Sequence, residues 1–144
     1  MGRAVVSLEI TEHRSLARWA ADCAEHVLPL FEQACPGDDR PRWAVQAARS
    51  WARGELSAVE AREAAFAAHA AARKATDPAA RAAARAAGHA AATAHAPGHA
   101  AHAATYAATA ASSAGPDMPA ASAEERQWQH ERLPEGLNRM AFRP

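Results

Sequence analysis

Large apolar residues recur every three or four positions in the first third of the chain. Between Glu12 and Gln33 they are Leu16, Trp19, Cys23, Val27, Leu30 and Phe31. This spacing places them on one face of an α-helix, so the pattern predicts a helix from Glu12 to Gln33. Residues 4–10 alternate loosely between apolar and polar instead. They predict a short extended arm within residues 1–11.

Capping signals divide the following segment into two further helices. The run Asp-Asp-Arg-Pro at 38–41 places a carboxylate and then a proline at a helix start, and this helix is expected to reach about Arg53. Ser57 and Glu60 form a capping box, in which each side chain accepts a hydrogen bond from the other residue's backbone N–H. The box predicts a third helix that ends near Lys74.

A fourth helix is expected to begin at Pro78, directly after a capping aspartate. If it continued unbroken to Ala111, it would be about 50 Å long at ~1.5 Å per residue. A domain of this length has a diameter of only about 40 Å. The dipeptide Pro97-Gly98 therefore predicts a break or sharp kink, with two helices meeting at an angle.

The C-terminal part is expected to hold a linker and a short helix. Residues 112–121 (SSAGPDMPAA) have the composition of a linker. Ser122 and Glu125 form a second capping box that predicts a short helix through Trp128, within a C-terminal helix and tail at 122–144. The chain is thus expected to be one all-α domain spanning residues 1–144. We expect a compact bundle of five to six helices with mostly antiparallel neighbours and alanine-rich central helices.

Composition explains how such a bundle would pack. More than half of residues 61–114 are alanine, and helices surfaced with small side chains can approach each other closely. The core then depends on a few large anchors. These are expected to be Trp19, Phe31, Trp43, Trp51, Phe66 and Trp128. A flat alanine face could also pack against a second copy of the chain, so a homodimer is a second expectation.

Charge and hydropathy exclude several classes of protein. The formal net charge is zero, so no nucleic-acid partner is expected. No run of eighteen apolar residues is present, so no membrane span is expected. The N-terminus lacks the pattern of a secretory signal. Two cysteines are too few for a disulfide framework, and Cys23 is expected to be a small buried residue. These features together favour a cytoplasmic protein.

Histidines provide the most distinctive candidate chemistry. His95, His99, His102 and Tyr106 fall within about 60° of one another on a helical wheel. Three imidazoles on one face could bind a divalent metal. However, residues 78–114 contain no acidic residue and the chain has no HExxH motif. We therefore expect no cofactor, and a divalent metal at this cluster is the less favoured alternative to solvent-facing or structural histidines.

Two further pairs lie at helical spacing. His69 and Arg73 are four residues apart, and an antiparallel neighbour could bring them to face Arg81, Arg85 or His89. This basic group could clamp an anion or a partner's carboxylate, or it could pair with carboxylates of the first helix. Asp22 and His26 are also four residues apart, which suits either an oriented general base or an ordinary helix pair. No nucleophile with a recognisable signature accompanies them, so an enzyme is not favoured.

The order of several segments resembles a family of small all-helical bacterial proteins that carry an immunity-protein-like label. The matching segments are HRSLARWAADCAEHVLPLFE (13–32), DDRPR (38–42), AARSWARGE (47–55), AAHAAAR (67–73), AARAAGHAAATAH (83–95) and ATYA (104–107). Together they cover most of residues 12–110. The resemblance implies an all-α fold and neutralisation of a toxin by direct binding.

Two functional hypotheses follow from these observations. The first is a small binding protein without enzymatic activity, immunity-like, that occludes a protein partner. The second is a protein that binds a small molecule or a metal, with acid–base catalysis as one form. Its pocket would comprise His69, Arg73, His89, His95, His99, His102 and Tyr106, with Asp22 and His26 added by the first helix.

Overall fold

The computed structural model describes the backbone of residues 2–115 and 118–137, and the side chains of residues 10–115 and 121–137. Within these ranges the chain forms six helices and no strand, which confirms the expected all-α class. The helices are α1 (Gly2–Ala34), α2 (Arg40–Ala52), α3 (Ala58–Lys74), α4 (Pro78–Ala92), α5 (His99–Ala114) and α6 (Met118–Arg132).

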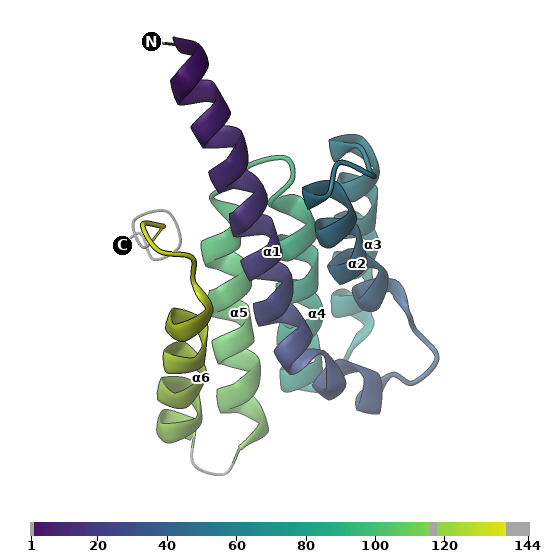
Figure 1. The fold of residues 1–144 in the computed structure, drawn as a ribbon. Helices are drawn as coiled ribbons and strands as arrows, with labels where there is room; N and C mark the ends of the chain where they lie inside the picture. Colours follow the sequence, from purple (N-terminus) through teal and green to yellow (C-terminus); the bar gives the residue numbers. More distant parts are fainter. Residues whose placement is uncertain (1, 116–117, 138–144) are drawn as a thin grey trace.

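Helix α4 lies at the centre of the bundle. It packs against α1, α2, α3 and α5, and α6 is held at one side by α5. Figure 1 shows α1 crossing in front of α4 and α5, with α2 and α3 on one side of it and α6 on the other. The three consecutive helices α3, α4 and α5 therefore lie side by side, and only one side of this layer is covered by α1.

The predicted helix starts in the middle of the chain are confirmed. Ser57 and Glu60 form the capping box at the start of α3. Asp77 caps α4 through a hydrogen bond from the Ala80 N–H to its carboxylate, 2.9 Å long. Capping of this kind satisfies backbone donors that have no partner inside the helix. These boundaries depend on a few neighbouring residues, which explains why the sequence located them.

The expected break at Pro97 is also confirmed. Helix α4 ends at Ala92 and α5 begins at His99, and the two helices pack against each other. Thr93 ends the first helix, where its buried hydroxyl donates to the backbone carbonyl of His89. The connection at 93–98 is therefore a reversal of direction, so residues from both helices can meet on one side of the layer.

The extended arm predicted for residues 4–10 is wrong. These residues belong to α1, whose first turns project beyond the other helices in Figure 1. Alternation over so few residues is a weak strand signal, and no second strand is available to pair with it. The segment instead prolongs the helix that begins downstream of it.

The predicted linker and second capping box are wrong in their positions. Helix α5 continues to Ala114 and α6 begins at Met118, so Ser122 lies inside α6. A proline at position 119 is compatible with the first turn of a helix, because the N–H it lacks would have no helical partner there. Glu125 lies within α6, where it is buried and its carboxylate contacts His26 of α1. The last seven residues of the predicted C-terminal tail, 138–144, lie outside the described residues.

The core consists mainly of alanine around a few large side chains. Trp19 and Phe31 are fully buried, as expected, and Cys23 is buried beside them. Trp43 and Phe66 were expected in the core but are 43% and 59% exposed. The buried faces of α2 and α3 are filled mostly by alanines, which leaves these two aromatic rings on the outer sides of their helices.

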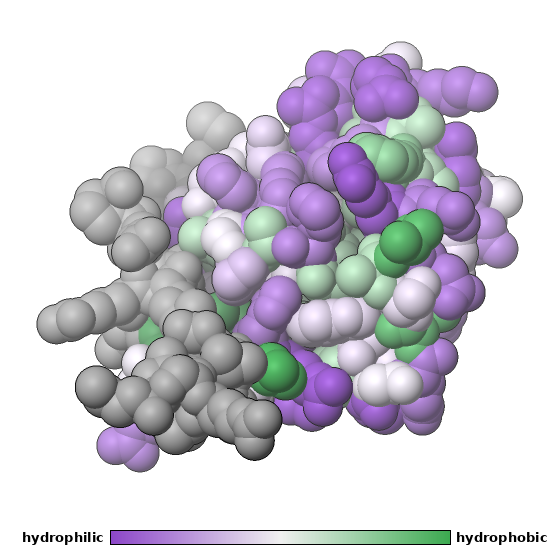
Figure 2. Space-filling model, turned by 90° about the horizontal axis from the view of Figure 1, so that it is seen from above, coloured by the Kyte–Doolittle hydropathy of each residue, from purple (hydrophilic) through white to green (hydrophobic). Residues whose placement is uncertain are grey.

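The outer surface is largely polar. Figure 2 looks down on the bundle from above and shows hydrophilic residues over most of the described surface, with strongly hydrophobic residues in separate spots. In the described part of the chain, no helix combines the length and the apolar character that a membrane crossing requires.

Candidate functional site

Five aromatic side chains from the neighbouring helices α3, α4 and α5 lie close together. We call this group the histidine–tyrosine cluster; its members are His69 of α3, His89 of α4, and His99, His102 and Tyr106 of α5. His89 is at its centre. The ring centroids of His69, His99, His102 and Tyr106 all lie 5.0–5.2 Å from that of His89. The spacing on α5 predicted that three of these residues share a face.

The contacts within the cluster are specific. The Nδ1 atoms of His89 and His99 lie 3.0 Å apart, so one ring donates a hydrogen bond to the other. The rings of His89 and Tyr106 are stacked, with an angle of 8° between their planes. The ring of His69 lies against Gly88, where a Cβ atom would stand only 2.6 Å from its Cε1. Gly88 therefore provides the space into which His69 fits.

Electrostatics keep the centre of the cluster uncharged. Burial, with added repulsion from the neighbouring histidines and Arg85, lowers the pKa of His89 to about 3. Burial also lowers the pKa values of His69 and His99, with smaller effects from nearby cationic groups. A hydrogen bond between two imidazoles requires one of them to act as an acceptor, and only a neutral ring can do so. The rings of His69, His89 and His99 are therefore neutral at neutral pH.

The remaining residues predicted for this site surround the cluster. Arg73 is exposed on α3 and its charge contributes to the lowered pKa of His69. His95 is exposed in the connection between α4 and α5, near enough to His99 to contribute to the lowered pKa of that ring. The guanidinium of Arg85 lies over the Tyr106 ring, 6.0 Å from the centroid. Arg85 precedes His89 by one helical turn, and the sequence predicts it among the basic residues that His69 and Arg73 could face.

The cluster does not have the arrangement of a metal site. Among the residues that the structure describes, no group of three or more histidine, cysteine, aspartate or glutamate side chains could hold a metal ion. The imidazoles instead contact one another through ring faces and one nitrogen–nitrogen hydrogen bond. What the arrangement offers chemically is a rigid aromatic surface bordered by arginines.

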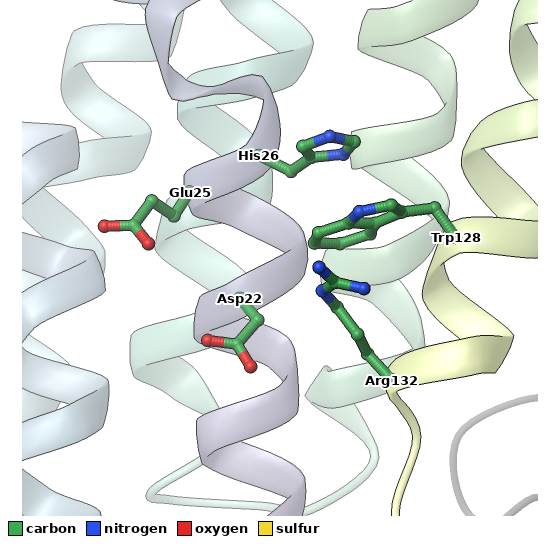
Figure 3. Close-up of a pocket in the computed structure, with 5 residues that line it drawn as sticks. All are labelled: Asp22, Glu25, His26, Trp128 and Arg132. Carbon is green, nitrogen blue, oxygen red and sulfur yellow. The ribbon is translucent and has the colours of Figure 1, made fainter.

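A second candidate site lies between α1 and α6. His26 stacks on Trp128 with ring centroids 3.7 Å apart, and the Arg132 guanidinium lies 4.2 Å from the Trp128 centroid. Figure 3 shows His26, Trp128 and Arg132 one above another, and we call these three residues the α1–α6 stack. They line a hollow of about 450 Å³ together with Asp22 and Glu25.

Interactions at both ends hold the α1–α6 stack in place. The Nδ1 of His26 lies 2.9 Å from a carboxylate oxygen of the buried Glu125. The fully buried Gln129 donates to the backbone carbonyl of Ala104 in α5, and the Trp19 indole donates to the backbone carbonyl of Gln129. These bonds fix α6 onto α1 and α5. The helical spacing around Trp128 is the only sequence signal that could have indicated the contact.

Asp22 and His26 do not join the histidine–tyrosine cluster. Asp22 and Glu25 point away from Trp128 in Figure 3, and both accept hydrogen bonds from Arg49 of α2. Asp22 and His26 also have different partners, although they lie one turn apart. The structure therefore divides the predicted site residues into two groups. Seven lie in or around the histidine–tyrosine cluster, His26 belongs to the α1–α6 stack, and Asp22 lies beside that stack.

Comparison with known proteins gives one match. The model of the family described as "Imm-5 like putative immunity protein" matches residues 7–136 of the chain. The comparison with curated proteins and that with solved structures return no match. The matched range includes both the histidine–tyrosine cluster and the α1–α6 stack.

Proposed function

The chain belongs to the family described as Imm-5 like putative immunity protein, and from this premise we propose that it neutralises a protein toxin by binding it directly. The family match over residues 7–136 is the observation that carries the proposal. A bound immunity protein acts by covering the surface that its toxin needs, so it requires a well-ordered face and no reaction of its own.

The surface has features that suit this role. Exposed aromatic residues such as Trp43 and Phe66 stand among charged and polar groups. Tyrosine, tryptophan, phenylalanine and arginine are enriched in the cores of protein interfaces. The two clusters described above are held by hydrogen bonds and ring contacts, so little conformational entropy would be lost when they bind. We place this activity in the cytoplasm, where an incoming or newly made toxin would have to be stopped.

The experiment has two stages. The untagged chain is first cross-linked and purified from its own cells, and the bound proteins are identified by mass spectrometry. Each candidate is then expressed alone and together with the chain. The proposal requires one partner that inhibits growth when alone and forms a stable complex in which growth is restored. It is overturned if no toxic partner is found, or if growth is restored without formation of a complex.

The oligomeric state is measured on the same material. A homodimer remains an expectation of the alanine-rich sequence, and light scattering on the free chain and on the complex tests it. The second hypothesis, a pocket for a small molecule or a metal, is not favoured by the family match. Among the described residues, no group of three or more metal-ligating side chains could hold a metal ion.

A further inference from the structure

Arginine residues of this chain differ sharply in their partners. Arginines of α2 and the segments beside it are paired with carboxylates: Arg42 with Glu32 at 2.6 Å, and Arg49 with both Asp22 and Glu25. Arg40 and Arg53 also have carboxylate partners. In this part of the molecule the guanidinium groups are already neutralised by the chain itself.

Arginines around the histidine–tyrosine cluster have no such partners. Within the described residues, no carboxylate forms an ion pair with Arg62, Arg73 or Arg85. For Arg73 and Arg85 the reason lies in the sequence, because residues 64–114 contain Asp77 as their single acid. Asp77 is occupied in capping α4. Arg62 stands between Glu60 and Glu63, and it forms an ion pair with neither.

Two of these arginines lie beside aromatic rings. The guanidinium of Arg62 lies 5.4 Å from the centroid of the exposed Phe66, and that of Arg85 lies over Tyr106. Positions 62, 66, 69 and 73 share one face of α3 because they are separated by three or four residues. We call the surface formed by Arg62, Phe66, Arg73, Arg85, His102 and Tyr106 the cationic aromatic face; it borders the buried part of the histidine–tyrosine cluster.

The neutral histidines affect both the charge around this face and the position of its tyrosine ring. Because burial keeps His89 uncharged, the centre of the cluster adds no repulsion to the arginines around it. His89 also holds Tyr106 by stacking, and Gly88 gives His69 its place. Tyr106 is therefore held in place before any partner arrives, which lowers the entropic cost of binding at that ring.

We propose that the cationic aromatic face is the docking surface of this chain and that it binds an acidic patch on the toxin. This inference rests on the proposed function and adds the chemistry of the partner. Guanidinium groups bind carboxylates through two parallel hydrogen bonds, and that interaction is strongest when aromatic surfaces exclude water. The arginines of α2 are already paired with carboxylates of the chain, whereas Arg62 and Arg85 lie beside aromatic rings and have no carboxylate partner. A set of carboxylates on a partner would therefore select the cationic aromatic face over the face of α2.

A protein partner fits better than a nucleic acid. The chain has a formal net charge of zero, whereas binding to DNA or RNA normally relies on an excess of basic residues that contact many phosphates. Arginines without carboxylate partners, on a face that also holds Tyr106 and the exposed Phe66, match the composition of a protein interface. Binding to nucleic acid is one of the outcomes that the test below distinguishes.

The test measures the affinity of the full chain for the toxin identified above. The variants Arg62→Glu and Arg73→Glu reverse exposed charges on the face, and Arg85→Gln removes one. Arg14→Glu reverses an exposed arginine on α1 and is the matched control. We expect each face variant to bind roughly tenfold more weakly or worse, and the control to remain within about twofold of the wild type. Unchanged circular dichroism spectra establish that each variant is folded.

The outcomes separate this inference from the proposed function. If the face variants bind and neutralise the toxin as well as the wild type does, the docking surface is wrong and the immunity function stands. If no toxin exists, the face is tested alone by NMR titration with an oligoglutamate peptide, an oligolysine peptide and duplex DNA. Selective shifts of the Tyr106 and His102 ring protons by oligoglutamate support carboxylate recognition. Preference for the DNA duplex, or no response to oligoglutamate, overturns it.

Discussion

His69 of α3 lies so close to Gly88 of α4 that a Cβ atom at position 88 would stand 2.6 Å from the imidazole ring. The contact joins two neighbouring helices at the edge of the histidine–tyrosine cluster. It also explains why glycine, a poor helix former, stands within α4. The pair therefore provides a direct test of how the cluster is built.

Replacing this glycine should disturb the cluster. In Gly88→Ala, His69 must leave its position, and we expect a loss of about 1–2 kcal/mol in the free energy of unfolding, because overpacking outweighs the gain in helix propensity. Chemical denaturation measures the change. In a His69→Ala background the same substitution should be stabilising, since the ring is gone. An equal effect of Gly88→Ala in both backgrounds would show that the contact is unimportant.

Acid should destabilise the fold through His89. Its pKa is about 3 in the folded chain and near the ordinary value of 6.5 in the unfolded chain, so the unfolded state binds more protons below pH 6.5. Stability is therefore complete above that pH and falls as the pH is lowered from 6.5 toward 3. We expect a loss of about 1–2 kcal/mol between pH 7.5 and pH 5, after allowance for partial exposure. The pH dependence should become flatter in His89→Gln and remain unchanged in His95→Gln; identical curves for all three proteins would contradict this assignment.

The buried glutamine of α6 should be important for its docking. Gln129→Ala removes the hydrogen bond to the Ala104 carbonyl and leaves a cavity, at an expected cost of about 1–3 kcal/mol. Gln127→Ala is the matched control, because Gln127 is exposed two residues earlier on the same helix. Hydrogen exchange of α6 amides together with denaturant melts measures both effects. Equal behaviour of the two variants would mean that Gln129 does not hold α6 in place.

The two thiols should react at very different rates. Cys23 is buried, and burial raises the pKa of its thiol far above the ordinary value, whereas Cys35 is half-buried near the end of α1. A thiol-specific reagent at pH 8 should label Cys35 in the native protein and Cys23 only after unfolding, since the thiolate is the reactive form. Mass spectrometry after digestion identifies the labelled residue. Rapid native labelling of Cys23 would contradict the packing described for α1.

Local features of the sequence determined most of the fold. The capping box at Ser57 and the aspartate at position 77 placed the starts of α3 and α4, because a cap involves only residues within one helical turn. Pro97 separated α4 from α5 for a similarly local reason, since proline lacks the N–H that a continuous helix needs. The spacing on α5 also placed His99, His102 and Tyr106 on one face before any neighbour was known.

Tertiary structure decided which of these groups meet. Only the packing of α3 and α5 against α4 brings His69, His89 and His99 together, and no pattern along the chain specifies those distances. Packing also left Phe66 outside the core, because alanines already fill the side of α3 that faces its neighbours. The packing of α6 against α1 likewise brought the Trp128 ring onto that of His26. A sequence determines which side chains share a helix face, whereas the approach of other helices determines what that face contacts.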